Sequence, residues 1–271
     1  MFKGETTMID INKARKFYKE YISGYNPEEP RIALKIAHIY RTAEEAKWLA
    51  KSLQLREEDV LLAELIGLLH DIGRFEQVKK YNTFLDKISI NHGEYGVKVL
   101  FEDNLIRNFI EDNQYDEIIR RAILNHNKSK IEDVTDKREL LHCKIIRDAD
   151  KLDIFKVILI DSLEASYPLD IYPKEPVNPK IKEDFIKNHK VDYSDIEACV
   201  DLLVGQLGYV FDINYLYSLE KINNENYLEE LIKRFEAKDE KTIEDLNELK
   251  NIAKKYMQEK IEEGEICLRN Y

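Results

Sequence analysis

Apolar residues recur at spacings of three and four along most of the chain, the pattern of helices that bury one face. Glycine and proline, which interrupt helices most often, number only nine and six in 271 residues. The pattern predicts helices at about 9–22, 30–53, 57–70, 75–81, 91–102, 103–112, 115–126, 138–162, 193–221, 224–237 and 239–263. The predicted fold class is therefore all-α.

Four of the six prolines fall between Pro168 and Pro179, and a helix cannot continue through that spacing. The segment is either a linker between two domains or a long loop inside one domain. The later stretch 205–219, GQLGYVFDINYLYSL, is too apolar for a solvated tail. We therefore expect one domain, residues 1–271, in which a helical portion of about 180–271 packs on the first portion. The charged pattern at 236–263 predicts an amphipathic helix with a solvated face.

The helix predicted at 57–70 is apolar nearly all round, so we expect it to lie at the centre of the fold. It ends in the pair His70-Asp71, and polar groups at the end of a buried helix are costly unless they are satisfied. Metal coordination would satisfy both side chains, and so would a helix end that reaches solvent. One His-Asp pair does not decide between these two interpretations.

Three further histidines lie in or beside apolar helical patterns: His38 within a helix, His92 at the start of one and His126 at the end of another. Histidine and carboxylate together suit a divalent transition metal. A lone histidine on a helix face is nevertheless more often a hydrogen-bonded structural residue. Among the acidic residues of RDADKLD, periodicity does not decide which of Asp148, Asp150 and Asp153 faces such a site.

The order of these residues resembles a known family. The pieces HIYRTA, GLLHDIGR and RDADKLD, with His, His-Asp and Asp in that order, look like the motifs of the HD superfamily of metal-dependent phosphohydrolases. The pieces NHGEYG and ILNHNK add two histidines, as in the branch that binds two metals. The resemblance implies an HD-domain-like helical bundle, with its core at about 30–165 and additional C-terminal helices.

The resemblance also implies the ligands of the metal, with Asp71 bridging two ions. These ligands are His38, His70, Asp71, His92, His126 and Asp150. It selects Asp150 because the family's last aspartate precedes a basic residue and a leucine. The cofactor would be one or two divalent ions of manganese, iron, cobalt, nickel or zinc, among which the sequence does not choose.

The implied activity is hydrolysis of a phosphomonoester or phosphodiester of a nucleotide or similar small metabolite, by attack of metal-bound hydroxide. Asp71, Arg74 and Lys151 are the expected catalytic residues. Two alternatives are a regulatory nucleotide-binding module with negligible turnover and a di-iron oxygenase on the same scaffold.

Four basic residues adjoin the expected ligands and form a predicted rim for substrate phosphate: Arg41, Arg74, Lys128 and Lys151. The segment 75–90 lacks clear periodicity and is either a lid, with Tyr81 and Phe84 stacking on a base or sugar, or ordinary core packing. His142 and His189 fall outside the motif and are expected to be structural, and Trp48 is expected in the core.

The net charge of −11 argues against broad nucleic-acid binding, which needs a basic surface. A small phosphorylated substrate is the expected partner. Three widely spaced cysteines, Cys143, Cys199 and Cys267, suggest reduced thiols and a cytoplasmic protein. The first 21 residues lack the apolar core of a signal peptide, and the longest apolar stretch, near 60–69, is too short to span a membrane.

Overall fold

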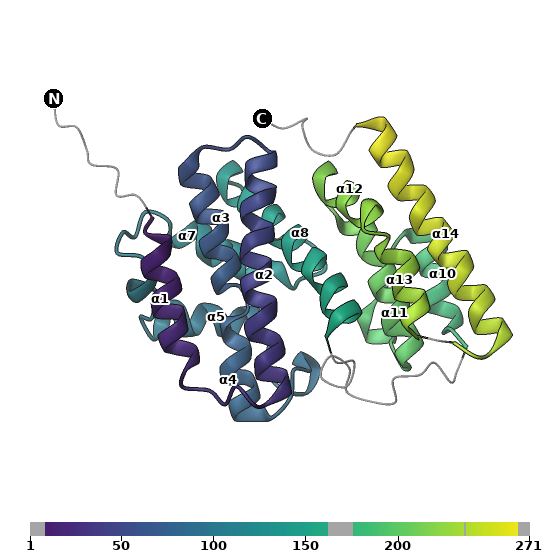
Figure 1. Ribbon diagram of the computed structural model, residues 1–271, viewed down its shortest axis with the longest axis horizontal. Coiled ribbons are helices and arrows are strands. Elements are labelled where there is room, and N and C mark those ends of the chain that lie inside the picture. The colour runs from purple at the N-terminus through teal and green to yellow at the C-terminus, as the bar shows by residue number, and fades with distance from the viewer. Residues whose placement is uncertain (1–8, 162–175, 236, 265–271) are drawn as a thin grey trace. The chain divides into compact units, whose positions relative to one another are not determined.

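The computed structural model describes residues 9–161, 176–235 and 237–264 (Figure 1). Regular structure in these ranges is helical throughout, which confirms the all-α prediction. The chain divides into two compact units, Met1–Asp153 and Ile154–Tyr271. That residues 180–271 pack on the first portion as part of one domain stays a prediction. Cys267 and most of the proline-rich segment lie outside the described residues.

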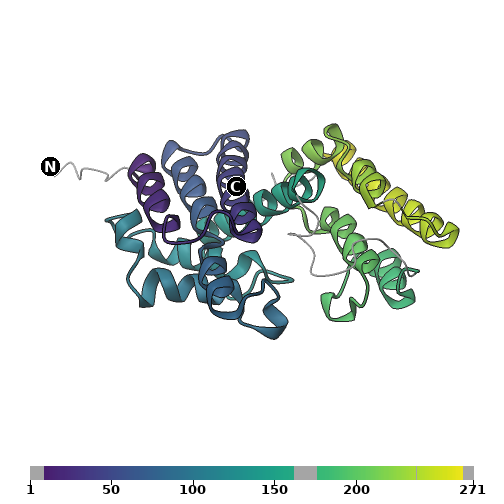
Figure 2. The ribbon, with the colours of Figure 1, turned by 60° about the horizontal axis from the view of Figure 1, so that its bottom comes forward.

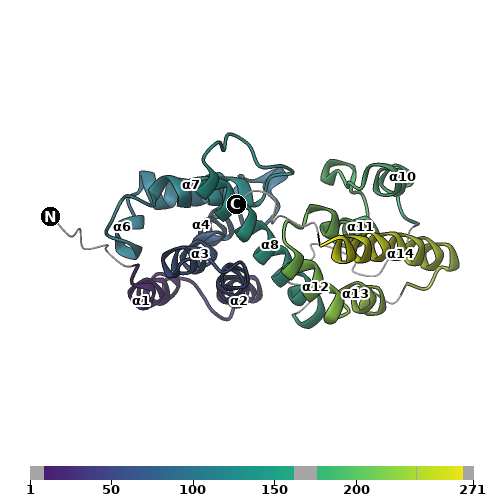
Figure 3. The same ribbon diagram turned by 90° about the horizontal axis from the view of Figure 1, so that it is seen from above.

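Within the described residues, the first unit consists of helical elements. They are α1 (Ile11–Ile22), α2 (Pro30–Ser52), α3 (Glu57–Leu69), α4 (Ile72–Tyr81), η1 (Asp86–Ile88), α5 (His92–Val97), η2 (Lys98–Glu102), α6 (Ile106–Phe109), α7 (Asp116–His126) and α8 (Lys137–Ile160), which runs past the boundary. Seen from above, α3 has α1 and α2 on one side and α4 and α7 on the other (Figure 3). The prediction that this helix is central and buried is confirmed, since Leu62, Leu65 and Leu68 are fully buried.

Helices α2 and α3 pack against each other along their length (Figure 1). The contact is close at Gly67, where a Cβ atom would lie only 2.6 Å from the Cα of Ala43. Pro30 at the first turn of α2 and the Glu29 side chain, which accepts from the Ile32 amide, fix where this helix begins. The close packing brings the middle of α2 beside the C-terminal end of α3.

The second unit is also helical. It contains α10 (Pro179–Asn188), η3 (Tyr193–Asp195), α11 (Cys199–Leu207), η4 (Gly208–Asp212), α12 (Leu216–Asn224), α13 (Tyr227–Phe235) and α14 (Glu240–Glu263). Helix α14, drawn in yellow, lies beside other helices of its unit (Figure 2). It is the predicted amphipathic helix, and it buries Leu246, Leu249 and Met257.

Several predicted boundaries were wrong. The expected helix at 193–221 is broken into η3, α11, η4 and α12, because Ile213 and Tyr215 are extended and bury their side chains at the break. The expected helix at 103–112 shrinks to α6, since Asn104 takes a left-handed conformation. Helix α10 was missed, although Asn178 caps it and Pro179 occupies its first turn.

Other differences are smaller. Helix α4 begins at Ile72, three residues earlier than expected, and the expected helix at 91–102 changes to a π-helical turn at Lys98. Trp48 is not in the core: its side chain is 53% exposed, with the ammonium of Lys51 over its ring. The described helices include none that is both long and apolar enough to cross a membrane.

Candidate metal centre

Six side chains from four helices and one helix junction converge inside the first unit. His38 comes from α2, the His70-Asp71 pair joins α3 to α4, His92 begins α5, His126 ends α7 and Asp150 lies on α8. They form two groups in which ligand atoms lie within 4.8 Å of one another: His38, His70 and Asp150, then Asp71, His92 and His126. The structure therefore brings together all six residues that the motif singled out.

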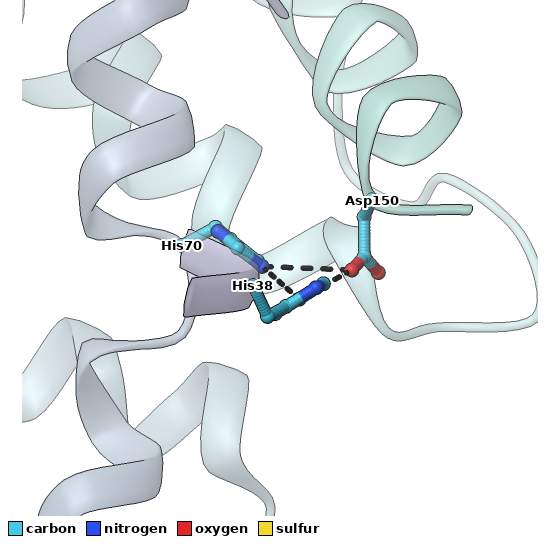
Figure 4. A group of neighbouring side chains, drawn as sticks. All are labelled: His38, His70 and Asp150. Atoms are coloured by element: carbon cyan, nitrogen blue, oxygen red, sulfur yellow. Dashed lines mark hydrogen bonds and ion pairs between the residues drawn. The ribbon is translucent and has the colours of Figure 1, made fainter. Parts of the chain in front are cut away.

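In the first group, two imidazoles and one carboxylate face one another (Figure 4). The Nε2 atom of His38 lies 3.1 Å from Oδ1 of Asp150, and the Nε2 atom of His70 lies 3.5 Å from the same oxygen. The two Nε2 atoms are 3.3 Å apart. Two nitrogens and one oxygen converge in this way on a single point.

The second group repeats this arrangement around Asp71. Its Oδ1 atom lies 3.4 Å from Nε2 of His92 and 3.7 Å from Nε2 of His126, and these two nitrogens are 3.0 Å apart. The other oxygen of Asp71, Oδ2, faces the first group at 3.6 Å from His38 and 3.7 Å from His70. One carboxylate therefore contributes one oxygen to each group.

In each of the four imidazoles, the Nδ1 atom lies within hydrogen-bond distance of a carboxylate or backbone carbonyl oxygen. Nδ1 of His38 lies 2.8 Å from Oδ2 of Asp153, and Nδ1 of His92 lies 2.6 Å from Oδ2 of Asp86. Backbone carbonyls serve the other two: the Gly67 oxygen lies 2.8 Å from Nδ1 of His70, and the Ile123 oxygen lies 2.6 Å from Nδ1 of His126. Because carbonyl and carboxylate oxygens only accept, each Nδ1 carries a proton, and a ring in its neutral form turns the lone pair of Nε2 inward.

This arrangement fits a divalent cation. Two neutral rings whose Nε2 lone pairs meet at 3.0 Å or 3.3 Å repel unless a positive charge lies between them. Imidazole nitrogen and carboxylate oxygen are also the donor set that zinc, manganese, iron, cobalt and nickel accept. Residues His38, His70, Asp71, His92, His126 and Asp150 could therefore hold divalent metal.

Burial and neighbouring charges shift the pKa values of these groups. Burial, the largest effect, lowers the pKa of His92 to about 3, and the charge of Arg74 adds to it. Burial and Lys35 lower the pKa of His38, but the hydrogen bonds to Asp150 and Asp153 outweigh them and the net pKa is raised. Burial raises the pKa of Asp71, but Lys35 and the surrounding histidines hold it well below the usual value.

Local packing fixes the second group. The side chain of Asn91 accepts from the amides of Gly93 and Glu94, so α5 begins with His92 in its first turn. A Cβ atom on Gly73 would lie 2.4 Å from the carbonyl oxygen of His92 and 2.7 Å from the Gly96 amide nitrogen. Glycine at 73 is therefore what lets the start of α4 touch the backbone of α5.

The end of α7 is also held in place. The buried guanidinium of Arg147 on α8 donates to the carbonyl of Asn125 at 2.8 Å and to the carbonyl of Lys128 at 2.5 Å. These two acceptors flank His126, so an interior cation binds carbonyls that the helix leaves free. Arg147 thereby ties the ligand position on α7 to the helix that carries Asp150.

The four predicted phosphate contacts have different surroundings. Arg74 lies nearest, with Nε 3.6 Å from Oδ1 of Asp71 and Nη1 2.9 Å from Oδ1 of Asp86. Arg41 donates from Nε to Asp153 at 2.6 Å, on the carboxylate that holds His38. Lys128 pairs with Glu132 at 3.1 Å, and the ammonium of Lys151 lies 3.4 Å from the carbonyl of Arg147. Their roles toward substrate stay predictions.

Sequence reasoning missed two charged residues of the centre. The Nζ atom of Lys35 lies 2.6 Å from Oδ2 of Asp71, and the spacing of three between Lys35 and His38 was a usable signal. Asp86, which contacts His92, lies on η1 within a segment of unclear periodicity, where no pattern marked it. Asp153 was weighed as a ligand, and the structure places it behind His38 instead.

The segment predicted as either lid or core has both exposed and half-buried side chains. Tyr81 is 38% exposed at the end of α4. The half-buried ring of Phe84 has Lys35 Nζ and the guanidinium of Arg74 each 5.5 Å from its centroid. Phe84 therefore lies close to the centre, and its contact with a substrate stays a prediction.

The remaining histidines have structural contacts. His142 is buried with Nε2 3.2 Å from Oδ1 of Asp59, and His189 stacks on Phe211 with ring centroids 4.4 Å apart. Cys143 is buried, which raises its pKa to about 12, so its thiol stays protonated at neutral pH.

Comparison with known proteins agrees with this geometry. The family model of the HD domain matches residues 36–154, an interval that contains all six converging residues together with Asp86 and Asp153. No curated protein and no solved structure matches the chain. The chain carries an HD domain over residues 36–154, and the His and Asp groups of that domain are consistent with the HD superfamily of metal-dependent phosphohydrolases.

Proposed function

We propose that this protein is a phosphohydrolase whose centre binds two divalent transition-metal ions. His38, His70, Asp71 and Asp150 would hold one ion, and Asp71, His92 and His126 the other. The observation that carries the proposal is the position of Asp71, whose two oxygens face the two histidine pairs separately. A carboxylate placed between two imidazole pairs suits a bridging ligand.

Ions bound here would supply a water-derived nucleophile and positive charge for phosphate oxygens. The chain's own residues would orient the substrate. Arg74 lies at the centre with a guanidinium suited to two phosphate oxygens. The carboxylates of Asp86 and Asp153 would keep the His92 and His38 rings in the tautomer that presents Nε2.

The proposed substrate is a phosphomonoester or phosphodiester of a nucleotide or similar small metabolite. The cations next to Asp71 support this, because Lys35 and Arg74 add positive charge where a phosphate would approach. Catalytic roles for Asp71, Arg74 and Lys151 belong to the same proposal, as do phosphate contacts from Arg41 and Lys128. A cytoplasmic location, and a surface that does not bind nucleic acid broadly, remain predictions from composition and charge.

An activity screen tests the proposal. Purified protein would be loaded in turn with manganese, iron(II) and zinc, checked for metal by elemental analysis, and assayed for release of phosphate from nucleotides, sugar phosphates and phosphodiesters. We expect hydrolysis that depends on metal and is lost in Asp71→Ala. Metal-loaded protein that hydrolyses nothing on the panel would support a regulatory binding module, and oxygen uptake by the iron form would support an oxygenase.

A further inference from the structure

A lysine outside the family motif touches the centre directly. Lys35 lies on α2, three residues before His38, so the two side chains leave the same face of the helix. Its Nζ atom lies 2.6 Å from Oδ2 of Asp71, the oxygen that faces His38 and His70. The Lys35 side chain is 15% exposed and the Asp71 side chain 3%, so the lysine lies on the solvent side of the carboxylate.

Two cations therefore flank the carboxylate proposed as the bridge. Lys35 contacts Oδ2, and Arg74 Nε lies 3.6 Å from Oδ1. Arg74 is also held elsewhere, because its Nη1 atom donates to Asp86, to Gln77 and to the Phe84 carbonyl. The Lys35 ammonium donates a hydrogen bond to Asp71 itself, so any change at this carboxylate changes the environment of the ammonium directly.

A divalent ion coordinated by Asp71 would be attracted by the same carboxylate charge that attracts the Lys35 ammonium. The attraction between the ammonium and Oδ2 then weakens, and the ion and the ammonium repel each other. The Lys35 stem is long and flexible, and its charge also lies over the ring of Phe84, 5.5 Å from the centroid. The ammonium can therefore turn from Asp71 toward the solvent side while it stays beside the centre.

We propose that Lys35 is a further substrate-binding residue: its ammonium neutralises Asp71 in the metal-free protein and contacts a phosphate oxygen of the substrate when the ions are bound. This inference rests on the proposed phosphohydrolase function and names a residue that the motif does not contain. The charge of Lys35 is expected to act in opposite directions on metal binding and on phosphate binding. Removal of the charge leaves more negative charge on Asp71 for a metal and less positive charge for a phosphate.

The test uses the full chain and two probes, manganese alone and then inorganic phosphate added to the manganese-loaded protein. Lys35→Met removes the charge and keeps the length of the side chain, and Lys35→Gln is a second neutral variant in case the first does not fold. Lys35→Arg keeps the charge. Lys47→Met is the matched control, because Lys47 lies on the same helix and pairs at 2.9 Å with another buried carboxylate, that of Glu64.

We expect both neutral variants to bind manganese at least as tightly as the parent and to bind phosphate roughly tenfold or more weakly, since a charge-assisted hydrogen bond is lost. Lys35→Arg should stay close to the parent for both probes, and so should Lys47→Met. Circular dichroism checks that each variant is folded.

Two results would overturn the inference, and they differ from failure of the proposed function. If a folded neutral variant binds phosphate as tightly as the parent, Lys35 does not contact substrate. If it no longer binds manganese, Lys35 helps to build the metal site instead. If the manganese-loaded parent binds no phosphate and hydrolyses no phosphoester, the proposed function fails, and this inference fails with it.

Discussion

The Nδ1 atom of His92 lies 2.6 Å from Oδ2 of Asp86, a residue of the short η1 helix between α4 and α5. His38 has the same kind of partner, because its Nδ1 lies 2.8 Å from Oδ2 of Asp153 on α8. Each histidine pair thus has one ring held by a carboxylate and one held by a backbone carbonyl. A carboxylate behind an imidazole fixes its tautomer and makes it a stronger ligand.

This symmetry gives a paired prediction. Asp86→Asn should weaken metal binding at the His92 group, and Asp153→Asn should weaken it at the His38 group, each by about tenfold to a hundredfold. Manganese titration of the two variants, followed by elemental analysis after dialysis, measures the effect, and each variant is the control for the other. Equal affinities in both variants and the parent would mean that these carboxylates do not tune the rings.

Replacement of neighbouring aspartates on α8 tests which of them is the ligand. Asp150 belongs to the first group, whereas Asp148 is buried and residues two apart point to different helix faces. Asp150→Asn should therefore lower the metal content of the purified protein, and Asp148→Asn should leave it unchanged. Elemental analysis decides, and loss of metal in Asp148→Asn alone would mean that the register on this helix is wrong.

The glycine contact between α4 and α5 should matter for both stability and metal binding. In Gly73→Ala the new methyl group meets backbone atoms of His92 and Gly96, which cannot move without shifting α5. We expect a loss of about 2 kcal/mol in the free energy of unfolding, measured with urea, and fewer metal ions per chain.

Gly96→Ala is the control for this substitution. Its Cβ atom would lie 3.4 Å from the nearest atom, a side-chain methyl of Ile123, which is ordinary contact. Alanine also favours a helix over glycine, so this variant should be as stable as the parent or more so. Equal stability of Gly73→Ala and Gly96→Ala would contradict the close approach.

Metal affinity should rise with pH because of His38. The hydrogen bonds to Asp150 and Asp153 raise the pKa of His38 in the metal-free protein, so a proton competes with metal at this ring near neutral pH. A raised pKa stabilises the metal-free fold below the unfolded value of about 6.5, and this contribution is lost as pH rises through the folded value. His92, with its pKa lowered to about 3, stays neutral over the same range.

Calorimetry between pH 6 and 8 checks this prediction. Metal binding should release a proton at the lower pH values, and the apparent affinity should increase until the pH exceeds the pKa of His38. An affinity that does not change across this range would show that His38 is neutral before metal binds.

The sequence was most informative where the residues that form a pattern lie close together on one helix. The apolar residues all round α3 predicted its central position, and the motif residues on α2, α5, α7, α8 and the α3–α4 junction predicted which side chains meet. The all-α class follows directly from such periodicity.

What could not be predicted depends on contacts between distant segments. Asp86 meets His92 only because the chain between α4 and α5 folds back on Gln77 and Arg74, and no local pattern encodes that return. Trp48 was expected in the core from its place on the second helix, but its side chain faces away from the core. The break at Ile213 follows from burial of its side chain in an extended conformation, which competes with helix formation.

The most direct test of the two-ion centre is anomalous diffraction from crystals of the manganese-loaded protein. The account predicts two peaks about 3.5–4 Å apart. One should lie beside His38, His70 and Asp150, the other beside His92 and His126, and Asp71 should touch both. A single peak, or peaks that Asp71 does not join, would contradict the assignment of Asp71 as the bridge between two metal ions.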